Sequence, residues 1–280
     1  MESADHPAAE KYFETYPESS DRCTGCFHHI YQPMRCFIEP QATAAHGSLP
    51  FPCPMDETGG YAMIIRYLGH AFFTLTLENG TVIAMDPYDE LYQYPRRRIP
   101  ADIVTMSHHH YDHDGVQAIT SDFKGIDTAG VHAFHGQNIV ITGIPTFHDH
   151  HQGEHRGNNL FFVIETEGLR IGHAGDLGHL PTQDMLKKIG KLDILLLPVG
   201  GKYTVDAKEA VQVWQMIQPT VCIPMHYRTQ YNPDMPVTTV DDFLAAATSQ
   251  AITMPLMRAT AGDMSERSPI VMLEIEETSV

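Results

Sequence analysis

The chain has 280 residues, of which 42% are hydrophobic, so it can bury the core of one large domain with an appendage. Its formal net charge of −17, with histidine counted as neutral, disfavours nucleic acid as a partner, because phosphate binding needs a positive surface. No stretch approaches the roughly 20 apolar residues of a membrane span, and the polar start of the chain does not resemble a signal peptide. We therefore expect a cytoplasmic protein, away from membranes, that acts on a small molecule. The sequence leaves a homo-oligomer open.

The first 60 residues differ from the rest, because they show no hydrophobic periodicity and hold four of the five cysteines. We predict that residues 1–60 form an extension packed on a main domain of residues 61–280. Cys23 and Cys26 have the C-x-x-C spacing of half a zinc site, and Cys36 could be a third ligand. The other half of such a site is irregularly spaced, so buried free thiols are the favoured interpretation.

From residue 61 onward, short apolar runs alternate with turn residues, which predicts a mixed α and β domain. Asn79-Gly80 is a strong hairpin signal, and Glu167-Gly168 joins two further runs. The run from Asp206 to Glu209 resembles a helix capping box. The predicted strands span residues 62–67, 72–77, 81–85, 102–106, 138–144, 160–165, 169–171, 192–197 and 220–223. The predicted helices span residues 182–189, 206–218 and 240–247.

Candidate metal ligands follow the ends of four of these strands. The first set is the pattern His-x-His-x-Asp-His, which begins at His108 and is closed by the turn residues Asp114-Gly115. His148, Asp176 and His226 each follow a later apolar run. Imidazole suits zinc and similar ions, whereas carboxylate suits harder ions. A mixed set of this kind is typical of a catalytic site rather than of a closed, cysteine-rich structural site.

This ordered ligand set resembles that of the metallo-β-lactamase superfamily, and the resemblance covers residues 61–280. It implies an α+β fold of the αββα sandwich type, here with an amino-terminal extension. It also implies two metal sites with Asp176 as the bridging ligand. The resemblance assigns the other ligands as His108, His110 and His148 in the first site, and Asp112, His113 and His226 in the second. Finer motifs, such as Leu68-Gly69-His70-Ala71 and Val199-Gly200-Gly201, resemble the single-domain hydrolase branch that includes ascorbate-6-phosphate lactonase-like proteins.

Several neighbouring residues have two interpretations each. His109 lies between two ligands, and alternation predicts that it points away from the metals. Asp86 and Asp149 are candidates to hold a ligating histidine in place, as carboxylates often do. Asp86 is equally well explained as a turn residue before proline. Three more residues could line the substrate pocket or serve only the structure: His70, Lys202 and Tyr203. His150 competes with His148 for the same ligand position.

We predict a metal-dependent hydrolase with a dinuclear centre, in which a bridging hydroxide attacks a small ester, lactone or phosphoester. Asp112 and Asp176 are the predicted catalytic carboxylates. The expected cofactors are two divalent ions, with zinc favoured over manganese or iron. The alternatives are a phosphodiesterase or nuclease, a di-iron redox protein, and a non-catalytic metal-binding protein. The redox branch usually carries Glu at the position of His110, and the complete ligand set argues against the non-catalytic alternative.

Overall fold

The computed structural model describes residues 63–262 and 269–277. The predicted extension of residues 1–60 lies outside this part of the chain, and so do Cys23, Cys26 and Cys36. The packing of the extension and a structural metal site in it therefore stay predictions. No helix in the described residues is long and apolar enough to cross a membrane.

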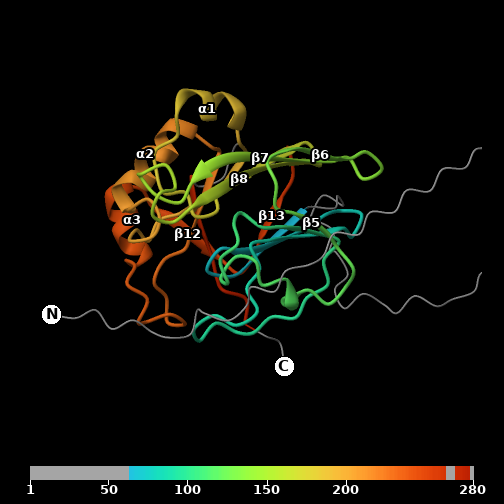
Figure 1. Ribbon diagram of the computed structural model, residues 1–280, viewed down its shortest axis with the longest axis horizontal. Coiled ribbons are helices and arrows are strands. Elements are labelled where there is room, and N and C mark those ends of the chain that lie inside the picture. The colour runs from blue at the N-terminus through green and yellow to red at the C-terminus, as the bar shows by residue number, and fades with distance from the viewer. Residues whose placement is uncertain (1–62, 263–268, 278–280) are drawn as a thin grey trace, which may run out of the picture. The chain divides into compact units, whose positions relative to one another are not determined.

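Two β-sheets form the centre of the domain (Figure 1). The six-stranded sheet has the order β13 (Met257–Ala259), β1 (Met63–Gly69), β2 (Phe72–Thr76), β3 (Val82–Met85), β4 (Ile103–Thr105) and β5 (Lys124–Ile126). The eight-stranded sheet has the order β12 (Ala251–Met254), β14 (Ile270–Leu273), β11 (Val221–Met225), β10 (Ile194–Pro198), β9 (Leu169–His173), β8 (Asn158–Thr166), β7 (Ile139–Phe147) and β6 (Gly130–Phe134). Both sheets mix parallel and antiparallel pairs.

The two sheets pack face to face, because side chains from both belong to one buried cluster. Phe73 and Met85 of the six-stranded sheet share this cluster with Phe161, Ile171 and Leu196 of the eight-stranded sheet. The alternating residues of the six-stranded sheet form a second buried cluster on its other face. There they pack against a loop that includes Tyr88 and Tyr94, and against the short 3-10 turn Val116–Ala118.

The described residues contain three α-helices, α1 (Gln183–Ile189), α2 (Ala207–Ile217) and α3 (Val240–Ala247), which lie together beside the eight-stranded sheet (Figure 1). The predicted capping box of α2 is present, since Asp206 accepts from the N–H groups of Lys208 and Glu209, and the Glu209 carboxylate accepts from the Asp206 N–H. The Asn79-Gly80 hairpin between β2 and β3 is confirmed as well. Five strands were not predicted: β5, β6, β12, β13 and β14.

The topology brings several strand ends to one edge of the sandwich. β3, β4, β7, β9 and β11 each run directly into a segment that carries a predicted site residue. Those residues are Asp86 after β3, His108 after β4, His148 after β7, Asp176 after β9 and His226 after β11.

Candidate metal centre

The loops that carry the candidate ligands approach one another closely at this edge. Gly178 allows the loop after β9 to approach the loop after β7, because a Cβ atom at Gly178 would lie 2.3 Å from the carbonyl carbon of His148. Gly200 makes another, because its Cβ would lie 2.3 Å from the backbone oxygen of His226. Real Cβ atoms do not come this near to backbone, so side chains at these two positions would push ligand-bearing loops apart.

The first group of candidate ligands is His108, His110 and His148, whose ligand atoms all lie within 4.8 Å of one another. The Nδ1 atom of His148 donates to the carbonyl oxygen of Tyr203 over 3.0 Å, and its Nε2 atom lies 3.1 Å from Asp176 Oδ2. The Nε2 atom of His108 is buried and has no hydrogen-bond partner. Burial, together with the nearby His113, lowers the pKa of His108 to about 3, which favours the neutral imidazole.

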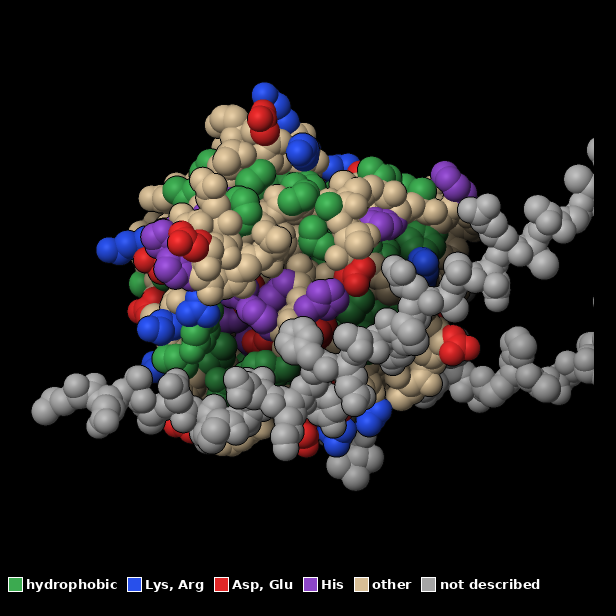
Figure 2. Space-filling view, viewed as in Figure 1, with side chains coloured by type: hydrophobic (Ala, Val, Ile, Leu, Met, Phe, Trp, Pro, Cys, Tyr) green, Lys and Arg blue, Asp and Glu red, His purple; other side chains and the backbone are tan. Residues whose placement is uncertain are grey.

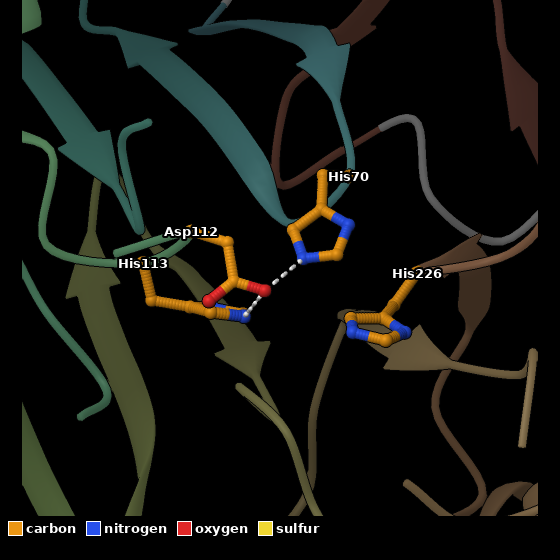
Figure 3. A group of neighbouring side chains, drawn as sticks. All are labelled: His70, Asp112, His113 and His226. Atoms are coloured by element: carbon orange, nitrogen blue, oxygen red, sulfur yellow. Dashed lines mark hydrogen bonds and ion pairs between the residues drawn. The ribbon is translucent and has the colours of Figure 1, made fainter. Parts of the chain in front are cut away.

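The second group is His70, Asp112, His113 and His226 (Figure 3). The Nδ1 atom of His113 donates to the Asp86 carboxylate over 2.8 Å, so its Nε2 faces the centre, where it lies 3.3 Å from Asp176 Oδ1. The Nε2 atom of His226 lies 3.3 Å from Asp176 Oδ2, and its buried Nδ1 has no hydrogen-bond partner. The two groups contain six of the seven predicted ligands.

Asp176 lies between the two groups and touches both. Its carboxylate is within 3.3 Å of His113 and His226 and within 3.1 Å of His148. Burial opposes its ionisation, but the adjacent His113 and His226 hold the pKa of Asp176 well below its usual range. The structure therefore brings all seven predicted ligands together, with an ionised carboxylate in the middle.

Two residues hold this arrangement from outside. Asp86 accepts hydrogen bonds from the N–H and the hydroxyl of Ser107 over 2.7 and 2.6 Å, in addition to its bond from His113. Asn159, which the sequence did not single out, accepts from the Asp176 N–H over 2.9 Å. An asparagine inside a β-strand gives no distinctive signal, because its role depends on a contact with the distant Asp176.

His70 lies deeper in the centre than its motif indicated. It is fully buried, and its Nε2 atom lies 3.1 Å from Asp112 Oδ2. Burial, together with the neighbouring His226, lowers the pKa of His70 to about 4. A neutral imidazole at this place can donate to Asp112 and has a second ring nitrogen, Nδ1, that is buried without a partner.

Asp149, Lys202 and Tyr203 were candidates to support a ligand or to line the substrate pocket. The Asp149 carboxylate contacts no ligating histidine ring, and it instead accepts four backbone N–H groups, those of His151, Gly153, His155 and Arg156. Our interpretation of Asp149 as the partner of a ligand was therefore wrong. Lys202 is exposed, whereas Tyr203 lines the cleft described below.

Two histidines of the same segments lie outside the centre. His109 is exposed between Asp114 and Asp127, with ring nitrogens 3.4 and 3.5 Å from these carboxylates. His150 is exposed and lies 3.4 Å from Glu209. His148, rather than His150, is the residue that reaches the other ligands.

A cleft of about 460 Å³ opens directly over the ligand groups. Its lining includes Asp112 and Asp176 together with an outer rim of Tyr92, Tyr111 and Arg156. Figure 2 shows histidine side chains gathered across the middle of this face with acidic side chains beside them. A larger groove of about 670 Å³, lined in part by Tyr227 and Glu274, contains none of the seven ligands, so size alone does not locate the site.

Comparisons with known proteins agree with this geometry. Residues 64–226 match the family described as the Beta-lactamase superfamily domain, and the chain belongs to this family. A UPF0173 metal-dependent hydrolase of Carboxydothermus hydrogenoformans is 32% identical over 197 residues, which cover 60% of this chain and 85% of that protein. A similarly named protein of Pyrococcus abyssi is 27% identical over 192 residues, which cover 59% of this chain and 84% of that protein.

Solved structures show the same relationship. A protein of Thermotoga maritima, described as a Zn-dependent hydrolase of the metallo-β-lactamase superfamily, is 35% identical, with a TM-score of 0.63 over 75% of this chain and 98% of its own. Igni18, a metallo hydrolase of Ignicoccus hospitalis, shares the fold at 22% identity. The match has a TM-score of 0.55 and covers 67% of this chain and 91% of Igni18. The predicted fold is confirmed, and the names of the relatives confirm the predicted class, a metal-dependent hydrolase. The ascorbate-6-phosphate lactonase-like detail and the cytoplasmic location stay predictions.

Proposed function

We propose that this chain hydrolyses a small ester, lactone or phosphoester with the help of two divalent cations held by the seven predicted ligands. The observation that carries the proposal is a cluster of buried nitrogen and oxygen atoms that make no hydrogen bond: His108 Nε2, His226 Nδ1, and the pair His113 Nε2 and Asp176 Oδ1, which face each other over 3.3 Å. Buried polar atoms are nearly always satisfied, so a cluster of unsatisfied ones indicates a missing partner. Imidazole nitrogens around a carboxylate fit a divalent transition-metal ion such as zinc.

The surrounding groups also fit this assignment. His113 and His148 each donate Nδ1–H to a fixed acceptor, Asp86 for one and the Tyr203 carbonyl for the other. Such bonds select the tautomer whose Nε2 lone pair can bind a cation, and they fix the ring orientation. When bound, the cations would act as Lewis acids that lower the pKa of water and polarise the electrophilic centre of the substrate.

Asp112 is the protein's own candidate for orienting the nucleophile. Its carboxylate lines the cleft and is held by His70. Burial opposes its ionisation, but the adjacent His113 and His70 hold the pKa of Asp112 well below its usual range. An ionised carboxylate at the floor of the cleft can accept a hydrogen bond from attacking water and fix the direction of attack.

The experiment has two parts. Elemental analysis of the full chain should find divalent cations, and a chelator should remove both the cations and the turnover of an ester, lactone and phosphodiester panel. Zinc, manganese and iron added back separately would identify the active metal. Turnover that survives complete metal removal would disprove the proposal. The net charge of −17 disfavours a nucleic acid substrate.

A further inference from the structure

The outer part of the cleft differs chemically from its floor. The floor is formed by histidines with Asp112 and Asp176, whereas the rim contains Tyr92, Tyr111 and Arg156. Among the described residues that line this cleft, Arg156 is the one lysine or arginine. In a chain with 35 acidic residues against 18 basic ones, a cation at the mouth of the cleft attracts anionic groups to this place.

Arg156 is held from both its backbone and its side chain. Its N–H donates to Asp149 Oδ2 over 2.8 Å, and Asp149 fixes the preceding loop through three further N–H groups. The guanidinium carbon lies 4.5 Å from the centre of the Tyr203 ring. The backbone carbonyl of Tyr203 accepts the hydrogen bond from His148 Nδ1, so the position of Arg156 is tied to that of a predicted metal ligand.

Within residues 63–262 and 269–277, the guanidinium of Arg156 has no acidic partner, although carboxylates are abundant. The ion pairs and side-chain hydrogen bonds of the described residues include none from its guanidinium nitrogens. Its donors are therefore available to a ligand, apart from the contact with the Tyr203 ring. A planar guanidinium matches the two oxygens of a carboxylate or a phosphate through paired hydrogen bonds.

The tyrosines of the rim supply an apolar surface beside this cation. Tyr92 is 50% exposed and Tyr111 is 69% exposed, and both face the same cleft as Arg156. Aromatic rings at the mouth of a pocket bind the apolar or ring-shaped body of a ligand, while their hydroxyl groups stay in water. The rim thus offers one anion-binding group and a broad apolar wall.

We propose that the substrate carries a carboxylate or phosphate group, separate from the bond that is cleaved, and that Arg156 binds this group while the tyrosines contact the body of the substrate. This inference rests on the proposed hydrolase function. It makes Arg156 a specificity-determining residue, because it acts on the part of the substrate that does not react. Arg156 at the rim would hold the anionic end of the substrate outward, while the bond to be cleaved reaches the ligand groups at the floor.

The test compares p-nitrophenyl esters that differ only at the far end of the acyl chain. Mono-p-nitrophenyl glutarate carries a carboxylate, p-nitrophenyl 4-phosphonobutyrate carries a phosphonate, and p-nitrophenyl valerate is neutral. For the metal-loaded full chain we expect kcat/KM to favour an anionic ester by about tenfold or more, as for a hydrogen bond to a charged group. Arg156→Gln should abolish this preference mainly through KM, and Arg156→Lys should restore part of it. The two anionic esters distinguish carboxylate from phosphate recognition.

The matched control is Lys208→Gln, which removes an exposed positive charge that does not line the cleft. It should leave the preference unchanged. Equal kcat/KM for neutral and anionic esters in the wild type, or equal losses on both in Arg156→Gln, would overturn the inference while the hydrolase function stands.

Binding of 4-phenylbutyrate and 4-phenylbutanamide, measured by calorimetry, separates the two proposals. If no ester, lactone or phosphodiester of the panel is hydrolysed but 4-phenylbutyrate still binds more tightly than 4-phenylbutanamide in an Arg156-dependent way, the hydrolase function fails and the anion site stands. If neither hydrolysis nor Arg156-dependent binding occurs, both fail.

Discussion

The Nε2 atom of His70 lies 3.1 Å from the Oδ2 atom of Asp112, although 42 positions separate the two residues (Figure 3). His70 occupies the turn between β1 and β2 with a φ of 57°, and Asp112 belongs to the loop after β4. The bond therefore joins two loops at the floor of the cleft and limits the rotation of a carboxylate that we assign to orienting the nucleophile. His70 is a positioning residue in this account.

Replacing His70 should lower activity through Asp112. We expect His70→Ala to reduce kcat by about 10- to 100-fold, the usual cost of losing a group that orients a metal-site carboxylate. KM should change little, because His70 does not line the cleft. His70→Asn is the control for the backbone, since asparagine tolerates a positive φ better than alanine. A fall in KM with unchanged kcat would contradict this role.

Asp86 should matter for stability as well as for metal binding. It is fully buried, and it accepts hydrogen bonds from Ser107 and His113. Asp86→Asn keeps the shape and suits the φ of 46°, but it replaces the charged acceptor. We expect the free energy of unfolding to fall by about 2 kcal/mol, as for a buried hydrogen bond to a charged group. Urea unfolding of the metal-free protein measures this, and an unchanged midpoint would show that Asp86 is only a turn residue.

Asp149 should contribute a pH-dependent part of the stability. Burial opposes its ionisation, but its four backbone donors hold the pKa of Asp149 well below its usual range. A carboxyl with a depressed pKa in the folded state stabilises the fold above its unfolded pKa, and this contribution is lost as the pH falls toward the folded pKa. Asp149→Asn should therefore be less stable than the wild type at pH 7. The difference in unfolding free energy should narrow below about pH 4. A difference that is constant with pH would refute this account.

Adjacent histidines should behave differently. His110→Ala removes a predicted ligand, so it should lower the metal content and reduce hydrolysis by about a thousandfold, equivalent to about 4 kcal/mol of transition-state stabilisation. His109→Ala should leave the metal content and the rate of hydrolysis nearly unchanged, because the His109 ring lies between Asp114 and Asp127. Elemental analysis and kinetics on both variants check this pair. Equal losses would show that the loop is assigned in the wrong register.

Local patterns in the sequence predicted local structure well. The Asn79-Gly80 turn, the Asp206 capping box and the range of α3 need only a few neighbouring residues, so they are visible in the chain itself. The strands that were missed depend on distant partners. β6 and β12 are largely exposed and lie next to β7 and β14, so neither of these two strands carries a clear hydrophobic pattern of its own. β14 is apolar, but it has only four residues, and its place between β11 and β12 depends on those distant partners.

The candidate site shows the same division. The spacing from His108 to His113 predicted a ligand loop, because a strand followed by a tight turn places these side chains together. The depth of His70 and the support from Asn159 depend on contacts between distant segments. Asp149 was misinterpreted because adjacency to His148 in the chain indicated a contact with its ring, whereas the Asp149 carboxylate points back to its own loop.

The most direct test of the central claim is to follow hydrolysis of the best probe as a function of bound divalent cation per chain. The chain for this titration should carry Cys23→Ser, Cys26→Ser and Cys36→Ser, so that ions at the amino-terminal cysteines are not counted. The account predicts no turnover in the metal-free protein and a rise that ends when two ions are bound. Turnover independent of metal content, or full turnover with a single bound ion, would contradict it.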